Sequence, residues 1–363
     1  MRLFQSLGIY PTYLPRLESL RNGLLSFAAA RDAFLADRYG ACHVLQPVLD
    51  AHPEAFFTIG NDAALQRRWA REQGLSTKVS LLDILRAQIE HHRTEVFYNL
   101  DPMRDGPGFV RRLPGCVKHS IAWRAAPSAN ADFSAYQLMV CNFPGILQGY
   151  ADQGIRSAYF APAHDPVMDR FAQNTDRPID LLFVGGYSRH HRRRAEVLET
   201  VAALNQRLKV VFHLDRSRLT RLAESPLGHV PLLKKHRRPA TICAVSADPV
   251  FGLDLYAAIS RAKVVLNGAV DMAGIDRGNM RCFEAMGCGA MMVSDAGNYP
   301  VGMVDGQTML TYESPKQAAD RILDIVAKVE LMQDIARRGW QLVSREYSKA
   351  RQWQKFQQLV AAL

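Results

Sequence analysis

Residues 263–295 read KVVLNGAVDMAGIDRGNMRCFEAMGCGAMMVSD, and this stretch decides the fold of the second half of the chain. Its two apolar runs, VVL and AMMVS, have the length and composition of strands in a parallel sheet that is buried on both faces. Between them lies a helix that we expect to begin near Asn279 and to end at Gly287 or Gly289. The apolar face of this helix has residues at a spacing of three, namely Met280, Phe283 and Met286. The stretch therefore predicts a strand, a loop, a helix and a second strand.

Polar residues gather at one end of this predicted unit. The loop GAVDMAGIDRGN follows the first strand and leads into the amino end of the helix. In open α/β sheets, ligands bind beyond the carboxyl ends of the strands, where the N–H groups at the start of the next helix also point. We therefore expect a binding site at this end of the stretch.

The length and composition of the chain indicate a soluble protein with two domains. Its 363 residues exceed one ordinary hydrophobic core, and an apolar fraction of 48% with 22% charged residues excludes a disordered chain. The net charge of +10 favours anionic ligands, which include nucleotide phosphates, nucleic acid and acidic lipid. Charge alone does not choose among these three.

Cysteine usage and the lack of long apolar segments bear on the compartment. The six cysteines are scattered without CxxC spacing, so we expect neither a zinc site nor a disulfide framework. The N-terminus MRLFQSLGIY lacks the apolar region of a signal peptide, and no uninterrupted apolar run reaches the length of about 18 residues that a membrane span needs. We expect a reduced, cytoplasmic protein, and peripheral contact with the inner face of the membrane is a further expectation.

Strand and helix patterns alternate in both halves of the chain, which predicts two doubly wound parallel sheets. The predicted strands of the first half are 3–10, 44–50, 55–60, 95–100, 116–123 and 136–142. Those of the second half are 179–186, 208–214, 241–246 and the two runs within 263–295. The predicted helices are 17–39, as one or two helices broken near Gly23, then 80–93, 191–206, 252–262, two helices within 315–343, and 349–363. A strand-like segment at 155–166 and a polar run at 168–178 separate the two halves.

Two glycines at the end of a predicted strand are the first candidate for binding. The segment FVGG ends at Gly185 and Gly186 and precedes the basic sequence YSRHHRRRAEVL. Glycines at such a position let the backbone approach a diphosphate closely, and the following helix start supplies N–H donors. An ordinary tight turn between a strand and a helix would use the same glycines, because the segment is not a GxGxxG motif.

An acidic pair is the second candidate. Asp276 and Glu284 lie eight positions apart, one on the loop and one inside the predicted helix. Both carboxylates could accept hydrogen bonds from ribose or sugar hydroxyls at the mouth of the sheet. The alternative is that they are solvated or paired with Arg277 or Arg281.

These segments together resemble a known family. FVGG, FGLDLYAAISRAKVVLN, RCFEAMGCGAMMVSD and ARQWQKF are similar to the group-1 type glycosyltransferases of GT-B fold, particularly the spore-maturation-protein type. The resemblance covers most of 155–356, and RCFEAMGCG is its most specific part. It implies an α/β protein with two Rossmann-like doubly wound domains that face each other across a cleft. It further implies an acceptor domain at 1–168, a nucleotide-sugar donor domain at 176–345, and a C-terminal helix at 346–363 that returns to the N-terminal domain.

The resemblance also implies roles for residues of the donor domain. Carried over by position, Glu284 would bind the ribose of a nucleoside diphosphate sugar, and Asp276 would approach the sugar where the family usually has a glutamate. Arg189 and Arg194 have the spacing of the basic pair that neutralises the donor diphosphate in the family, although arginine stands where lysine is usual. The full set of donor-binding candidates is Gly185, Gly186, Arg189, Arg194, Asp276, Asn279, Arg281 and Glu284.

Candidates for the catalytic residue of the N-terminal half rest on local chemistry. His119 in CVKHSIAWR is the first candidate, and members of the family often have a histidine facing the cleft at this point. A half-buried histidine that is satisfied by a backbone carbonyl is the alternative. Asp101, which ends EVFYNLD, is the second candidate for a catalytic base.

The resemblance implies a hexosyltransferase-like enzyme that moves a sugar from a nucleoside diphosphate sugar, such as a UDP-sugar, to a glycan, lipid-linked or protein acceptor. We expect no metal and no cofactor, because arginines and a helix terminus would neutralise the diphosphate. The acidic pair favours retention of the anomeric configuration.

Two alternatives stay open. One is a nucleotide-sugar epimerase of the same fold, and the other is a non-enzymatic basic protein that binds a polyanion through its Arg-rich helix and the KKHRR run at 234–238. KKHRR could equally be a solvated loop or a contact for an anionic membrane. Specific nucleic-acid binding is not expected, because this run has no interleaved aromatic residues.

Overall fold

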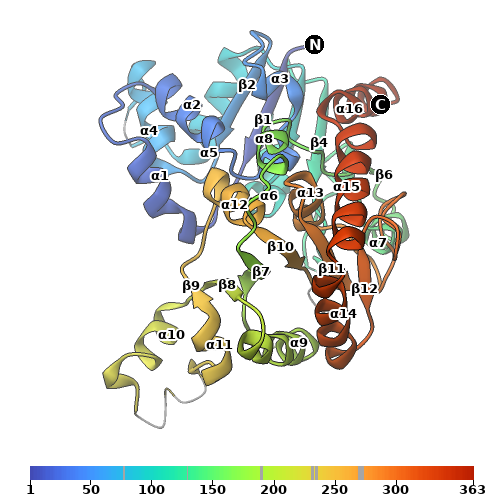
Figure 1. Cartoon of the computed structure of the whole chain (residues 1–363). Helices are drawn as coiled ribbons and strands as arrows, with labels where there is room; N and C mark the ends of the chain where they lie inside the picture. Colours follow the sequence, from blue (N-terminus) through green and yellow to red (C-terminus); the bar gives the residue numbers. More distant parts are fainter. Residues whose placement is uncertain (77, 129, 189–190, 230–232, 234–235, 269–273) are drawn as a thin grey trace. The chain divides into compact units, whose positions relative to one another are not determined.

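The computed structural model of the chain contains two compact units (Figure 1). The N-terminal unit consists of Met1–Ala163 together with Tyr347–Leu363, and the C-terminal unit consists of His164–Glu346. Each unit is built on a six-stranded sheet whose strands all pair in parallel. The structure describes all residues except 77, 129, 189–190, 230–232, 234–235 and 269–273.

The sheet of the N-terminal unit has the strand order β2-β1-β3-β4-β5-β6. β1 lies between β2 and β3, with Leu3 opposite both Ala55 and Val96. Its five residues are all buried, as expected for a central strand of a parallel sheet with helices on both faces. The strands are β1 (Leu3–Leu7), β2 (Ala55–Ile59), β3 (Val96–Asn99), β4 (His119–Trp123), β5 (Leu138–Cys141) and β6 (Ser157–Tyr159).

Polar side chains fix where several helices of this unit begin. Ser26, Asp62 and Ser80 accept hydrogen bonds from backbone N–H groups in the first turns of the helices that follow them. Ser80 therefore caps the helix that the sequence predicts at 80–93. The helical segments are η1 (Pro11–Tyr13), α1 (Leu14–Leu20), α2 (Phe27–Asp37), η2 (Ala41–His43), α3 (Gln46–Leu49), α4 (Ala63–Glu72), α5 (Leu81–His91), α6 (Pro102–Val110) and α7 (Pro144–Asp152).

The C-terminal helix α16 (Lys349–Ala361) belongs to the N-terminal unit. Its Phe356 ring packs against the rings of Tyr98 and Phe160, with centroids 5.0 and 5.8 Å apart. The Nζ atom of the buried Lys349 donates to backbone carbonyls of the segment around η2, including that of Ala41 at 2.6 Å. The predicted return of the last helix to the N-terminal domain is confirmed.

The sheet of the C-terminal unit has the order β12-β11-β10-β7-β8-β9. β7 lies between β10 and β8, with Leu181 opposite both Val264 and Val210. These strands form the middle of a core in which Phe183 and Phe212 make an edge-to-face ring contact. The strands are β7 (Ile179–Gly186), β8 (Val210–Asp215), β9 (Ser246–Ala247), β10 (Ala262–Leu266), β11 (Met291–Asp295) and β12 (Leu310–Tyr312).

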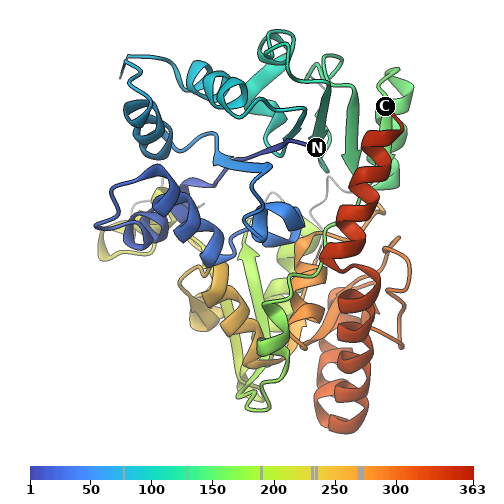
Figure 2. The same cartoon turned by 90° about the horizontal axis from the view of Figure 1, so that it is seen from above.

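Helices cover this second sheet on both faces, and α14 and α15 pack beside β11 and β12 (Figures 1 and 2). Figure 1 also shows α10 and α11 extending beyond β8 and β9. The helical segments are α8 (Met168–Ala172), α9 (Arg192–Ala202), η3 (Ala203–Gln206), α10 (Arg218–Ala223), η4 (Pro226–His229), α11 (Ala240–Val245), α12 (Gly252–Ser260), α13 (Met280–Gly287), α14 (Pro315–Ala327) and α15 (Val329–Glu346).

Two of the predicted strands are wrong. Residues 44–50 contain the short helix α3, and 241–246 fall almost entirely in α11, which the two-residue strand β9 follows. Both runs are short and apolar, and such a run fits a buried helix as well as a buried strand. A proline marks each helix start: Pro47 lies in the first turn of α3, where its missing N–H is not needed, and Pro239 directly precedes α11.

Candidate functional site

The carboxyl ends of β7 and β10 meet at the point where the strand order of the C-terminal sheet reverses. From β7 the chain proceeds to β8 and β9 on one side, and then returns to add β10, β11 and β12 on the other. Open α/β sheets bind ligands at such a switch point, because the loops after the two central strands diverge there. Gly185 and Gly186 end β7, and Asn267 follows β10, so these residues lie at this switch point.

The glycine turn after β7 makes room for an arginine. The guanidinium of Arg194, from the first turn of α9, lies 5.1 Å from the centre of the Phe183 ring. A Cβ atom added at Gly185 would be only 2.6 Å from the Nη2 atom of Arg194, so no other residue type fits here without a shift. The sequence prediction placed Gly185, Gly186 and Arg194 together at this edge, and the structure does the same. Arg189 lies outside the described residues.

The side chain of Asn267 ties the neighbouring strands to α13. Its Nδ2 atom donates to the Ser294 hydroxyl on β11 at 3.2 Å, and its Oδ1 atom accepts from the Nδ2 atom of Asn279 at 3.2 Å. The hydroxyl of Tyr312 on β12 donates to the Asn267 carbonyl at 3.0 Å. Asn267 is a polar residue that sequence reasoning missed, although its position directly after a buried strand is a usable signal.

Helix α13 begins at this network. Asn279 is its N-cap residue, but its side chain accepts no hydrogen bond from a backbone N–H of the helix. Its Nδ2 atom donates to Asn267, and its Oδ1 atom accepts from the Cys282 thiol at 3.6 Å. Inside the helix, Nη1 of Arg281 donates to Oε2 of Glu284 at 2.6 Å. Glu284 is only 4% exposed. The predicted alternative of a Glu284–Arg281 pair is therefore present, and it holds a carboxylate inside the helix one turn from the helix start.

Asp276 lies on the extended segment that leads into α13. This segment pairs with Asn298, and Asp276 is buried. The next residue, Arg277, is buried as well, and its Nε atom lies 2.6 Å from Oδ2 of Asp295 at the end of β11. The structure thus brings Asp276, Asn279, Arg281 and Glu284 into one continuous segment beside the ends of β10 and β11.

Burial keeps two titratable groups at this edge neutral. Desolvation, with a smaller contribution from the charge of Asp295, raises the pKa of the Cys282 thiol to about 12. Burial likewise raises the pKa of Tyr312, with Asp295 adding to the effect and Arg194 opposing it. Both groups therefore act as neutral hydrogen-bonding partners at neutral pH, and the charges at this edge belong to arginines and carboxylates.

A second switch point lies in the N-terminal sheet, between β1 and β3. Asp101 follows the carboxyl end of β3, and its Oδ2 atom occupies the place where a Cβ atom of Gly8, after β1, would otherwise lie. Asp101 is also the N-cap residue of α6, yet its side chain makes no capping hydrogen bond. The carboxylate is therefore directed across the end of the sheet toward the β1 loop.

A cluster of charged residues surrounds Asp101. The Nε atom of Arg104 lies 3.4 Å from Oδ2 of Asp101, and its Nη2 atom lies 2.5 Å from Oδ1 of Asp105. Asn99 donates from Nδ2 to Oδ2 of Asp105 at 2.8 Å, and its Oδ1 atom accepts from the Asp101 backbone N–H at 2.8 Å. Arg104 and Asp105 were not predicted, and their only sequence signal is the polar segment DPMRD after a buried strand.

We expect the substitution Asp105→Asn to stabilise the protein at neutral and alkaline pH. Burial raises the pKa of Asp105 from 3.8 to about 6, and the nearby Arg104 only partly opposes this shift. The native state therefore binds the proton more tightly than the unfolded state, so the free energy of unfolding falls as pH rises from about 4 to about 6. The loss amounts to as much as about 3 kcal/mol. An asparagine resembles the protonated carboxyl and avoids this loss.

Denaturant unfolding from about pH 4 to about pH 8 measures this effect. The wild type and Asp105→Asn should have similar stability near pH 4 and diverge above it. An equal pH dependence of both proteins would contradict the assignment.

His119 is not at the ligand edge, contrary to expectation. It is the first residue of β4, opposite Val96 at the start of β3, and therefore lies at the amino edge of the sheet. Its Nδ1 atom contacts Oε1 of Gln137 at 3.2 Å. Asp101, by contrast, lies beyond the carboxyl end of β3. The predicted strand 116–123 begins three residues too early. The prediction therefore placed His119 inside the strand, whereas in the structure it is the first residue of β4.

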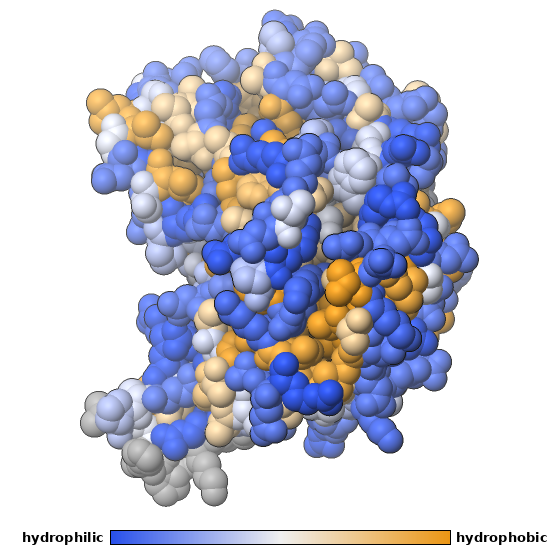
Figure 3. Space-filling view, in the orientation of Figure 1, coloured by the Kyte–Doolittle hydropathy of each residue, from blue (hydrophilic) through white to orange (hydrophobic). Residues whose placement is uncertain are grey.

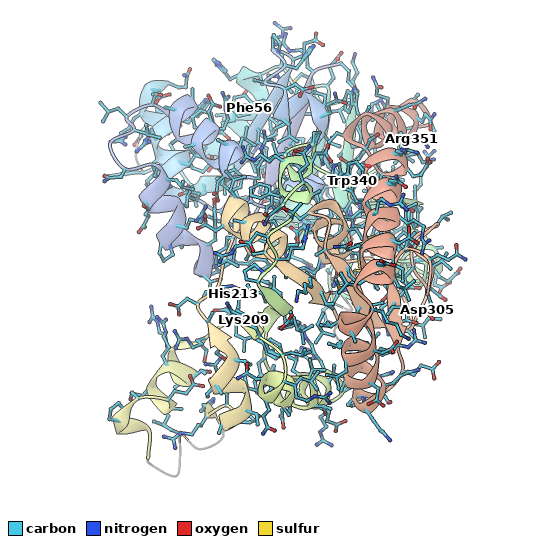
Figure 4. All side chains as sticks on the ribbon, viewed as in Figure 1. Phe56, Lys209, His213, Asp305, Trp340 and Arg351 are labelled. Atoms are coloured by element: carbon cyan, nitrogen blue, oxygen red, sulfur yellow. The ribbon has the colours of Figure 1, made fainter. Side chains whose placement is uncertain are left out.

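A groove of about 380 Å³ lies at the other, amino end of the C-terminal sheet. Arg177 at its rim donates to carbonyls near the ends of α12 and α13, and Trp340 of α15, labelled in Figure 4, donates to Asp169 at 2.8 Å. Figure 3 shows apolar side chains exposed among hydrophilic ones on this unit. Apolar residues of the groove are Ala172, Val329, Met332, Ala336 and Trp340.

Among the residues that the structure describes, no three His, Cys, Asp or Glu side chains are grouped so that they could hold a metal ion. Nor does any helix of the described residues have the length and apolar character needed to cross a membrane.

Part of the chain matches a family model. Residues 243–358 match the family described as Glycosyl transferase-like, and this range includes α13 and the strands β10 and β11. No curated protein sequence matches the chain.

Solved structures share the fold of the whole chain. HepE of Anabaena in complex with UDP and glucose is 12% identical, with 100% of both chains covered and a TM-score of 0.57. The same protein in complex with UDP-glucose gives a TM-score of 0.55 at 12% identity over 99% of both chains. A glycosyltransferase from Rickettsia africae is 8% identical over 98% of this chain and 97% of that chain, with a TM-score of 0.57.

At such low identity these structures establish the fold, whereas the family match concerns the C-terminal unit and α16. Both agree with the expectation from the sequence. The chain therefore has the GT-B fold, and its residues 243–358 match the model of a glycosyl transferase-like family.

Proposed function

We propose that this protein transfers a sugar from a nucleoside diphosphate sugar to an acceptor, and that its C-terminal unit binds the donor. The observation that carries this proposal is the meeting of Gly185, Arg194 and the start of α13 at the switch point of the C-terminal sheet. A backbone without side chains, a guanidinium and helix N–H groups are what a diphosphate requires.

The diphosphate would lie between Arg194 and the start of α13. Because no side chain of the described residues caps the helix, the N–H groups of Met280 and Arg281 in the first turn of α13 remain available to an anion. Arg194 would also stabilise the charge that develops on the departing nucleoside diphosphate. In this scheme the enzyme needs neither a metal ion nor a cofactor.

The nucleoside and the sugar would lie beside the acidic residues. Glu284 would accept hydrogen bonds from the ribose hydroxyls, and Asp276 would contact the sugar. The complexes of HepE with UDP and with UDP-glucose support a UDP-sugar as donor here. The acidic pair favours retention of the anomeric configuration.

The acceptor would be a glycan, a lipid-linked saccharide or a protein. Asp101 of the N-terminal unit would be the catalytic base for the acceptor hydroxyl. Asp101 lies beyond the carboxyl end of a central strand, whereas His119 lies at the other edge of the same sheet. A carboxylate at this position can take the proton of an attacking hydroxyl.

Peripheral contact with an anionic membrane on the cytoplasmic side is also proposed. α10 exposes Leu219 (48%) and Leu222 (44%), and Arg218 and Arg221 are exposed beside them. Apolar side chains next to arginines suit the interface of an anionic bilayer. Of the KKHRR run, Lys234 and Lys235 lie outside the described residues, and Arg238 is buried against Glu224 at 2.5 Å.

Thermal unfolding with UDP, GDP and TDP tests the donor site. We expect one nucleotide to raise the midpoint more than the others, because a base-specific pocket binds the folded state only. Release of UDP from UDP-sugars should then identify the sugar. An equal lack of response to all three nucleotides would count against a donor site and favour the polyanion-binding alternative, which also predicts a steep dependence on salt.

A further inference from the structure

The segment after β3 presents an acceptor and a donor of hydrogen bonds side by side. Within the described part of the chain, the Oδ1 atom of Asp101 and the Nη1 atom of Arg104 have no hydrogen-bond partner. The two side chains are 26% and 21% exposed, so both are accessible to a small ligand. A hydroxyl group is the ligand that can donate to a carboxylate and accept from a guanidinium at the same time.

Two glycines make this arrangement possible. The Asp101 carboxylate occupies the place of a Cβ atom at Gly8, and the Arg104 guanidinium occupies that of a Cβ atom at Gly60, after β2. Any other residue at either position would displace the charged group. The pair is therefore seated in the ends of β1, β2 and β3 and does not lie loosely on the surface.

The charge of the pair indicates what kind of hydroxyl compound would bind. Arg104 lies between two carboxylates, 3.4 Å from Asp101 and 2.5 Å from Asp105, so it offers no surplus positive charge. Nearby, Arg21 of the α1 segment is paired in the same way, at 2.5 Å, with the buried Asp62. Despite the net charge of +10, this edge is suited to a neutral ligand and not to a phosphate.

The buried groups behind the pair indicate a site and not only a structural ion pair. The Asp105 side chain is fully buried, and its burial costs stability at neutral pH, as described above. The hydroxyl oxygen of Ser6, which is fully buried close to the same Gly60 position, has no hydrogen-bond partner among the described residues. Unsatisfied and costly polar groups of this kind concentrate at functional sites.

We infer that Asp101 and Arg104 form a hydroxyl-binding subsite for a neutral saccharide acceptor, and that Asp105 and Asn99 position Arg104 and Asp101 for it. This inference rests on the proposed function and adds the class of acceptor. Asp101 contacts the acceptor hydroxyl directly. Asp105 acts through Arg104 and is a positioning residue.

Saturation-transfer NMR on the full chain with D-glucose, N-acetylglucosamine and glucose 6-phosphate tests the subsite. At least one neutral sugar should bind the wild type, and the phosphorylated sugar should bind no more tightly. The variants Asp101→Asn and Arg104→Gln should each weaken binding about 10- to 100-fold, because each removes a charge-assisted hydrogen bond. His119→Gln, at the other edge of the same sheet, is the matched control and should bind like the wild type.

The variant Asp105→Asn distinguishes a positioning role in sugar binding from a role in the stability of the fold. This variant should be more stable than the wild type near pH 8 and yet bind the neutral sugar more weakly. A purely structural role would leave sugar binding unchanged or let it follow stability.

The inference is overturned if no neutral sugar binds, if Asp101→Asn and Arg104→Gln bind as tightly as the wild type, or if glucose 6-phosphate binds more tightly than glucose. The UDP-induced thermal shift, measured on the same proteins, keeps the proposed function separate. A UDP shift without sugar binding overturns the subsite alone, and sugar binding without a nucleotide response overturns the donor site alone.

Discussion

Glu284→Gln is expected to remove most of the stabilisation that UDP gives to the wild-type protein. The Glu284 carboxylate is buried against Arg281 at 2.6 Å, and glutamine keeps its size and one oxygen for that contact. The lost charge weakens hydrogen bonds to ribose hydroxyls, which costs about 1.5–3 kcal/mol and lowers affinity about 10- to 100-fold. With UDP at about 100 times the wild-type Kd, a stabilisation of about 2.7 kcal/mol should fall to between about 0.4 and 1.4 kcal/mol.

The matched control is Asp324→Asn in the same unit. Asp324 is 59% exposed on α14 and pairs with Lys328 at 2.8 Å, so its charge is solvated and far less important to any buried site. This variant should respond to UDP like the wild type. Thermal unfolding of both variants without nucleotide shows whether the fold is intact. Full UDP stabilisation of Glu284→Gln would refute the ribose role.

The segment from β10 to β11, which we propose binds the donor, could be predicted from sequence because its signals are local. α13 begins after Asn279 and ends at Gly287, and Gly289 has a φ of +71°, the left-handed conformation that glycine adopts most easily. The sequence signal for the turn after β7 is also local, because Gly185 and Gly186 directly follow the apolar residues of the strand. Alternation of strands and helices then determines that the carboxyl ends of these strands share one edge.

The charged cluster of Asp101, Arg104 and Asp105 at the carboxyl edge of the N-terminal sheet could not be predicted in the same way, because it depends on residues that are distant in sequence. The Arg104 guanidinium is held by Asp105 beside it, but its place is left open by Gly60, about forty positions earlier. The prediction for His119 was wrong for a different reason. An error of three residues in the start of a strand is enough to misplace a side chain relative to the edge of a sheet. Apolar periodicity does not resolve such a start, because Cys116 and Val117 extend the apolar run beyond the hydrogen-bonded strand.

Lys349→Met is expected to destabilise the N-terminal unit strongly. Lys349 is 4% exposed, and its Nζ atom donates to the carbonyls of Ala41, Cys42 and Val44 at 2.6, 3.1 and 2.8 Å. Methionine fills the volume but donates nothing, so buried carbonyl groups lose a partner at a cost of about 1–3 kcal/mol each. Because Gln352 still donates to Cys42 at 3.1 Å, we expect a total loss of about 3–5 kcal/mol.

Urea unfolding at neutral pH measures this loss, with Lys355→Met as the control on the same helix. Lys355 is exposed, so its replacement removes a solvated charge and should change stability by less than about 0.5 kcal/mol. The lysine ammonium can serve three carbonyls that converge from a single segment, since it has three N–H donors on a flexible stem. If Lys349→Met were as stable as Lys355→Met, those carbonyls would have to be satisfied by other means. The attachment of α16 would then rest on the Phe356 ring contacts and on the hydrogen bonds that Gln352 donates.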